Sequence, residues 1–133
     1  MANTTQLIEA LQRGDFDKAL GRLYSEDANV VAKQRARYID AVKEFAKRFD
    51  SSREVRLYSA PGRTEIGGNH TDHNHGVVMA AAVDLDMVAV VAQNNSTQVN
   101  IYSKNFERTD SVDVSCLTVQ ENEKGSSPSL IRG

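Results

Sequence analysis

The chain has 133 residues, of which 40% are hydrophobic and 26% are charged, and its formal net charge is −2. This length is enough for one domain with a buried core. The slightly acidic balance argues against nucleic acid and anionic lipid as partners. The single cysteine, Cys116, excludes an internal disulfide and a cysteine-based zinc site. Its place in an alternating segment predicts a half-buried structural thiol.

The sequence contains neither a recognisable secretory signal nor a membrane-spanning segment. The N-terminal residues show no basic region followed by an apolar one, so no secretory signal is predicted. The longest apolar stretch, residues 77–83, is far shorter than the roughly 20 residues that span a bilayer. We therefore expect a soluble, cytoplasmic protein with no membrane partner.

Apolar residues in the first third recur with the period of a helix. One stripe covers residues 7–11, a second covers 16–24, and the third and strongest covers 38–49, with charged residues on its opposite face. Gly14-Asp15 separates the first two stripes, as a stop followed by a new N-cap. Residues 50–52 end the third. The pattern predicts helices that pack through these stripes.

After residue 53 the pattern changes to that of strands. Residues 55–59 alternate, and the apolar runs 77–83 and 87–92 predict two buried strands linked by a tight turn at Asp84-Leu85-Asp86. A short helix is the alternative for the alanine-rich first run. Thus the predicted fold class is α+β, with helices followed by a mixed or mainly antiparallel sheet.

Shorter signals follow in the last third of the chain. Residues 94–97 form a turn cluster, residues 99–103 alternate as a half-exposed strand, and residues 112–114 allow one more short strand. The tail 121–129 is charged and contains glycine, serine and proline, which predicts a loop.

A polar run at residues 60–76 contains all three histidines of the chain. Loops beside buried strands are common places for binding and catalytic groups. A sugar site needs donors and acceptors held at hydroxyl spacing: Asp72 can accept from two hydroxyls, while His70 and Asn69 can both donate and accept. The run therefore offers several hydrogen-bond donors and acceptors to a polar ligand.

Two other interpretations of this run are open. His70, Asp72, His73 and His75 could bind zinc or nickel, or the run could be a purely structural polar loop. The four positions fit neither one helix face nor one strand face, and no further ligand is signalled elsewhere in the sequence. We therefore expect no metal.

The stretches Pro61-Gly62-Arg63, Gly68, His70-Thr71-Asp72, Asn74 and Gly76 closely resemble the N-terminal signature of galactokinases. These enzymes belong to the small-molecule kinase family that includes homoserine, mevalonate and phosphomevalonate kinases. The resemblance implies that the complete enzyme transfers the γ-phosphoryl group of ATP to the C1 hydroxyl of galactose, with ATP and Mg²⁺ as cofactors. It implies Arg63 as the catalytic residue, which assists the transfer electrostatically. It implies Asn69, His70 and Asp72 as substrate-binding residues.

The sequence also departs from the family pattern. Asn69 stands where galactokinases have glutamate, His73 where they have tyrosine, and Glu65 where they have asparagine; Gly67 replaces an apolar residue. These departures leave open a kinase for N-acetylgalactosamine or another sugar, and a sugar-sensing relative without catalysis.

The later machinery of the family has no counterpart in the sequence. No phosphate-binding motif is found, the segment 125–127 is predicted to be a loop, and no aspartate can be assigned as the base. We therefore expect no cofactor-binding residue here, and no activity of the chain by itself. Residues 1–34 are interpreted as a helical N-terminal extension and residues 35–133 as a truncated sugar-binding domain, whose exposed apolar surface would favour self-association.

Overall fold

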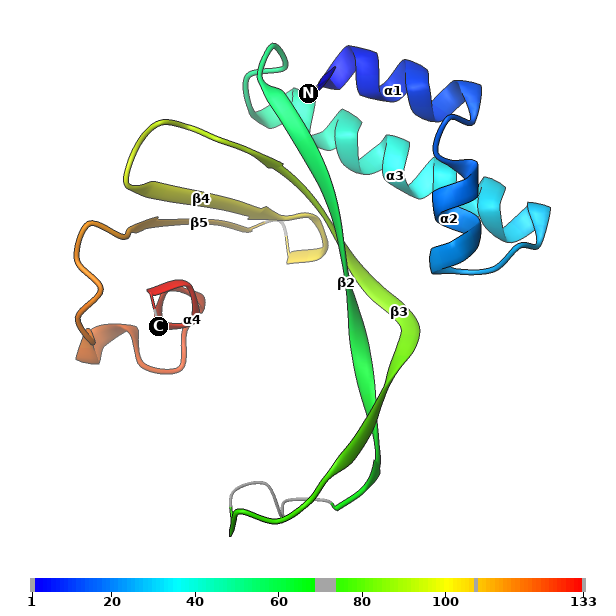
Figure 1. Cartoon of the computed structure of the whole chain (residues 1–133). Helices are drawn as coiled ribbons and strands as arrows, with labels where there is room; N and C mark the ends of the chain where they lie inside the picture. Colours follow the sequence, from blue (N-terminus) through cyan, green and yellow to red (C-terminus); the bar gives the residue numbers. More distant parts are fainter. Residues whose placement is uncertain (1, 69–73, 107, 133) are drawn as a thin grey trace. The chain divides into compact units, whose positions relative to one another are not determined.

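The computed structural model describes residues 2–68, 74–106 and 108–132. The chain consists of two compact units, Met1–Gln93 and Asn94–Gly133. The boundary expected between residues 34 and 35 falls inside a helix of the first unit. Helices and antiparallel strands make up both units, which confirms the α+β class (Figure 1).

The first unit begins with two short helices, α1 (Thr4–Arg13) and α2 (Asp17–Leu23). α1 starts with a capping box, in which Asn3 and Gln6 each accept the backbone N–H of the other. α1 ends at Gly14, whose φ of 83° lies in the left-handed region that favours glycine. The sequence thus located the stop correctly. Asp15, however, does not cap α2, because Phe16 occupies the N-cap position; the Asp15 side chain accepts from Arg13.

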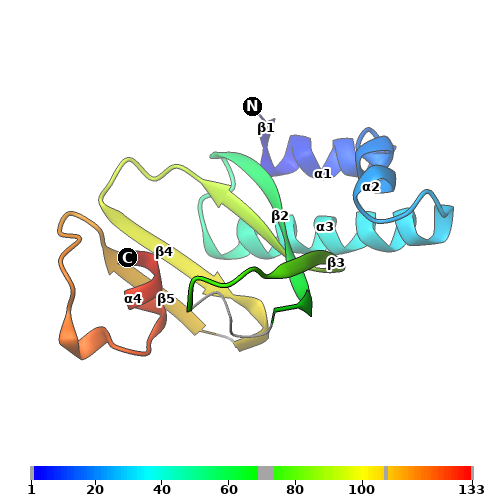
Figure 2. The ribbon, with the colours of Figure 1, turned by 60° about the horizontal axis from the view of Figure 1, so that its bottom comes forward.

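The third helix, α3 (Ala28–Arg48), is the longest and forms the centre of the first unit. Asp27 caps it by accepting the N–H groups of Asn29 and Val30. α1 and α3 lie side by side (Figures 1 and 2). The predicted stripes meet in one core whose buried members come from the three helices and the first long strand: Leu7, Leu11, Leu20, Tyr38, Val42 and Val55.

The sheet of the first unit is a long antiparallel hairpin of β2 (Glu54–Gly67) and β3 (Met79–Ala92), with the short β1 (Ala2–Asn3) on the outer edge of β2. The prediction of two strands within 77–92 was wrong, because Asp84-Leu85-Asp86 lies within β3 and does not form a turn.

The residues expected to turn form an irregularity in the ladder. Pro61 pairs with Asp86 and Arg63 pairs with Ala82, so Gly62 alone faces the three residues 83–85. A Cβ on Gly62 would lie 3.2 Å from the carbonyl oxygen of Leu85. The ladder can therefore continue past the extra residues because glycine leaves room for them.

Only one half of the hairpin is covered by helices. Val55 is buried, and Leu57 and Ser59 are half-buried against the helical layer, whereas every β2 residue from 60 to 67 is exposed. In Figure 1 the strands continue well beyond the helices. The uncovered half includes apolar side chains: Ile66, Met79, Leu85 and Met87 are each more than half exposed.

The second unit is a small hairpin with a short helix. β4 (Gln98–Ser103) and β5 (Arg108–Asp113) pair antiparallel, joined through η2 (Lys104–Phe106), and Asn94 organises the expected turn before β4. The tail is not a plain loop, because it contains η3 (Glu121–Glu123) and α4 (Ser127–Arg132), which lies beside β5 (Figure 2).

The prediction for Cys116 was wrong. The residue follows β5 in a loop and its side chain is exposed. The apparent alternation of the sequence continued past the true end of the strand at Asp113.

Candidate functional site

The predicted sugar site maps to the end of the β2–β3 hairpin. β2 ends at Gly67 and β3 starts at Met79, so the residues between them close the hairpin. Gly68 and His75 both have left-handed φ values, 86° and 59°, and His75 is exposed. At Gly68 and again at His75 the backbone therefore departs from the extended conformation of the two strands. The described part contains neither a helix of the α type nor a further strand between Gly67 and Met79.

Three of the four predicted site residues, Asn69, His70 and Asp72, lie outside the described residues, and their contacts stay predictions. The same holds for His73 in the alternative metal site. Among the residues that the structure does describe, no group of three His, Cys, Asp or Glu side chains is placed to hold a metal ion.

Arg63, the predicted catalytic residue, lies on β2 and pairs with Ala82 of β3. Its side chain is exposed, and within the described ranges it forms no hydrogen bond or ion pair. An exposed guanidinium can present its donors to an incoming anionic or hydroxyl-bearing group. Its backbone position directly follows Gly62, where the ladder is irregular.

A partly buried polar cluster lies on the other side of that irregularity, where the hairpin meets the helices. The Asp86 side chain is only 2% exposed and accepts from Tyr24 at the end of α2, from Ser59 on β2 and from Arg37 on α3. Arg37 Nη2 also donates to the Asp86 carbonyl oxygen at 2.7 Å. We call Tyr24, Arg37, Tyr38, Ser59 and Asp86 the Asp86 cluster. Tyr38 joins it through a hydroxyl–hydroxyl contact of 2.9 Å with Tyr24.

The electrostatics of the cluster favour an ionised Asp86. Burial alone would raise the pKa of this carboxyl, but the hydrogen bonds from Ser59, Tyr24 and Arg37 outweigh burial and lower the pKa. The same contacts act on the partners. The hydrogen bond to Asp86 raises the pKa of Arg37, and burial together with the Asp86 carboxylate raises the pKa of Tyr24. Asp86 is therefore a fixed negative charge that two hydroxyl donors and one cation surround.

The sequence did not predict the Asp86 cluster. Asp86 was assigned to a turn, and Tyr24 and Tyr38 were assigned to apolar stripes. The signal that could have found it is a single carboxylate inside a long apolar strand, because such a group needs buried partners. The partners themselves come from elements far apart in the sequence and are not readable from spacing.

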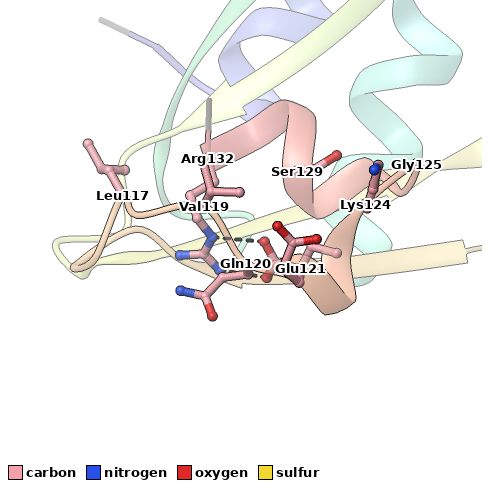
Figure 3. A pocket seen from close by; sticks show the side chains of 9 residues that line it. Leu117, Val119, Gln120, Glu121, Lys124, Gly125, Ser129 and Arg132 are labelled. Atoms are coloured by element: carbon pink, nitrogen blue, oxygen red, sulfur yellow. Dashed lines mark hydrogen bonds and ion pairs between the residues drawn. The ribbon is translucent and has the colours of Figure 1, made fainter.

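The second unit contains a pocket of about 310 Å³ lined by residues 117–132, among them Leu117, Val119 and Arg132 (Figure 3). Arg132 pairs with Glu123 at 2.8 Å and donates to the carbonyl oxygens of Asp113 and Cys116. Its hydrogen bond lowers the pKa of Glu123. Arg132 therefore ties α4 to the end of β5, and its donors are already engaged within the protein.

No helix in the described part of the chain is both long and apolar enough to cross a membrane.

Comparison with known proteins shows that the hairpin is similar to a recognised family signature. Residues 43–93 match the model of the galactokinase galactose-binding signature. This range contains the end of α3, both long strands and the loop between them. No solved structure matches the chain.

The particular proteins that the chain resembles are bacterial galactokinases. It is 41% identical over 66 residues to the galactokinase of Fusobacterium nucleatum, which covers 50% of this chain and 17% of the relative. It is 35% identical over 82 residues to that of Staphylococcus saprophyticus, covering 62% and 21%. It is 40% identical over 62 residues to that of Bacillus subtilis, covering 47% and 16%. The chain thus aligns with about a fifth of each relative's length, and the expected resemblance to the N-terminal portion of galactokinases is confirmed.

Proposed function

We propose that this chain supplies the galactose-binding part of a galactokinase-type enzyme, which transfers the γ-phosphoryl group of ATP to the C1 hydroxyl of galactose. The observation that carries the proposal is the signature match over residues 43–93, which spans the whole β2–β3 hairpin. The matched signature supports sugar binding, and the similarity to galactokinases supports the kinase class.

In this proposal His70 and Asp72 bind the ring hydroxyls, and Asn69 binds the hydroxyl at carbon 6. Such a site discriminates between sugars because a buried polar group left without its partner costs about 1–3 kcal/mol. Arg63, on β2, stabilises the charge that develops near the C1 oxygen during transfer. Its exposure and lack of partners among the described residues suit this role.

The glycine–serine segment at residues 125–127 does not fit ATP. Ser127 begins a helix of only six residues, and the nearby Arg132 is occupied by Glu123 and by backbone carbonyls. We therefore assign ATP and Mg²⁺ to the complete enzyme and propose that the chain by itself binds sugar without phosphorylating it. In a coupled ATP-consumption assay with galactose, the 133-residue protein should stay at background, and clear turnover would contradict this assignment.

The test of sugar binding is a titration of the ¹⁵N-labelled chain followed by NMR. Galactose should shift the amides of the loop and of the neighbouring strand ends. Glucose, which differs at one hydroxyl, should bind more weakly by about tenfold, the size expected for one lost hydrogen bond. A titration with N-acetylgalactosamine tests the alternative specificity that Asn69 and His73 leave open, because tighter binding of this sugar than of galactose would favour it. No shift with any sugar would contradict the proposed function.

Two variants sharpen this titration. Asp72→Asn should abolish the galactose response, because the amide loses one acceptor and the negative charge. The matched control is Asp40→Asn, which makes the same chemical change at an exposed position on α3 and should leave the response unchanged. Equal losses in the two variants would point away from a specific role for Asp72.

We further propose that the isolated chain self-associates through the uncovered half of the hairpin. Val77, Leu85 and Met87 are 91%, 77% and 74% exposed, and exposed apolar side chains next to a strand edge favour association with a second copy. Light scattering over a range of concentrations should show a mass above that of one chain. A monomer at all concentrations would contradict this proposal.

A further inference from the structure

The Asp86 cluster joins the hairpin to the helices next to the exposed half of β2. Ser59 and Asp86 contact Tyr24 and Arg37, whereas β2 is exposed from residue 60 to its end. Asp86 pairs with Pro61, and the ladder irregularity at Gly62 follows at once. The proposed sugar loop is therefore supported by two strands that are fixed at one end.

Because the loop lies far from this fixed point, the rigidity of the fixed point determines how precisely the loop is positioned. Gly68 follows Pro61 by seven positions, which corresponds to roughly 23 Å of strand at about 3.3 Å per residue. A tilt of about 10° at the fixed point would move the loop by roughly 4 Å on the same scale. Displacements of about 1 Å already impair the positioning of reacting groups. Small angular freedom at Asp86 would thus be amplified at the loop.

The chemistry of the cluster suits a directional fixed point. Apolar contacts between sheet and helices resist separation but tolerate sliding, whereas hydrogen bonds have a preferred direction and length. The Asp86 side chain accepts hydrogen bonds from Tyr24 just after α2, from Arg37 on α3 and from Ser59 on β2. Arg37 also donates to the backbone carbonyl oxygen of residue 86. These contacts fix the position of the β3 backbone at residue 86 as well as its side chain.

We propose that Asp86 is a positioning residue for the sugar loop: through Tyr24, Arg37 and Ser59 it sets the direction in which the β2–β3 hairpin leaves the helices, and so the place of Arg63 and the loop. This inference rests on the proposed function for the identity of the ligand. Asp86 itself touches neither sugar nor the reacting atoms in this proposal.

The test uses the 133-residue chain and compares Asp86→Asn with wild type by amide hydrogen exchange. We expect the ladder amides of residues 63–67 to exchange about tenfold faster, while the helical amides around Leu11 and Val42 change by less than about twofold, as expected for a local opening. The galactose Kd should rise by about three- to tenfold, because the loop samples more orientations.

A merely structural role would give a different pattern. In that case hydrogen exchange at the Leu11 and Val42 amides would accelerate by the same factor as exchange at residues 63–67, and this result would overturn the proposal. An unchanged exchange rate at residues 63–67 would overturn it as well. The matched control is Asp17→Asn, which removes the Asp17–Arg35 ion pair between α2 and α3 without touching the hairpin. It should leave both the hairpin amides and the galactose Kd unchanged.

A second variant and a sugar-independent measurement allow the test to be decided even if Asp86→Asn does not fold or the chain does not bind galactose. If Asp86→Asn does not fold, Tyr24→Phe takes its place, since it removes one donor to Asp86 and keeps the charges; the same contrast between hairpin and helix amides applies. The exchange measurement needs no sugar. If the wild-type chain failed to bind galactose, the proposed function would be contradicted, while the exchange pattern would still decide whether Asp86 fixes the hairpin.

Discussion

Arg37 on α3 and Asp86 on β3 are joined through both the side chain and the backbone of the aspartate. The guanidinium forms an ion pair with the Asp86 carboxylate, and its Nη2 donates to the Asp86 carbonyl oxygen at 2.7 Å. The Asp86 side chain is 2% exposed and that of Arg37 is 39% exposed. The pair therefore has one desolvated member, whose charge depends on its partners.

Arg37→Gln should destabilise the first unit. Two hydroxyl donors remain on Asp86, so we expect a loss of about 1–3 kcal/mol in the free energy of unfolding, the range for a buried acceptor that loses a partner. Chemical denaturation measures it. The control Arg35→Gln removes the more exposed pair with Asp17 and should cost less than about 1 kcal/mol. Equal losses would contradict the view that burial of Asp86 sets the difference.

Acid should weaken the first unit through Asp86. Its pKa is lowered in the folded chain, so the unfolded chain binds the proton more readily. The stability that this carboxylate contributes is fully present above its ordinary pKa, about 3.9, and is lost as the pH falls through the lower folded value. The midpoint temperature of thermal unfolding should therefore fall more steeply below about pH 4 for wild type than for Asp86→Asn. Parallel declines would show that Asp86 does not contribute.

Gly14→Ala should test the left-handed end of α1. The φ of 83° is unfavourable for alanine, and the added Cβ would lie 2.8 Å from Asp17 Oδ2. We expect a loss of about 1–2 kcal/mol by denaturation. Gly67→Ala is the matched control, because among the described residues no atom beyond the chain neighbours lies within 4 Å of the added Cβ. A loss at Gly67 as large as that at Gly14 would argue against a conformational cause.

Leu11→Ala should show where the core lies. Leu11 is 1% exposed, and truncation of a buried leucine typically costs about 2–5 kcal/mol. Leu23→Ala makes the same change at a side chain that is 60% exposed, and it should stay within about 0.5 kcal/mol of wild type. Denaturation midpoints measure both losses. Equal midpoints for the two variants would refute the assigned core.

Asn69→Glu should change the preference at carbon 6 of the sugar, if the residue-by-residue resemblance holds at this position. A carboxylate forms charge-assisted hydrogen bonds that are roughly twice as strong as neutral ones. We expect the ratio of the Kd values for 6-deoxygalactose and galactose to rise about fivefold, which corresponds to roughly 1 kcal/mol. The NMR titration measures both values. A constant ratio would show that residue 69 does not contact this hydroxyl.

The sequence by itself determined the first helices and the similarity to a known signature. The apolar stripes with Gly14 determined the first helices, because helical period and a left-handed stop are local properties. The motif from Pro61 to Gly76 identified the galactokinase signature, which the comparison confirmed for residues 43–93. Both depend on neighbouring residues and so can be read in one dimension.

Only the tertiary structure decided how the hairpin is built and held. Asp84-Leu85-Asp86 reads as a turn, yet pairing with β2 across the room left by Gly62 keeps it within one strand. Asp86 is buried because Tyr24, Arg37 and Ser59 reach it from three other elements, 62, 49 and 27 positions away in the chain. A buried charge is stable only with such partners, and their meeting is a property of packing that no local pattern contains.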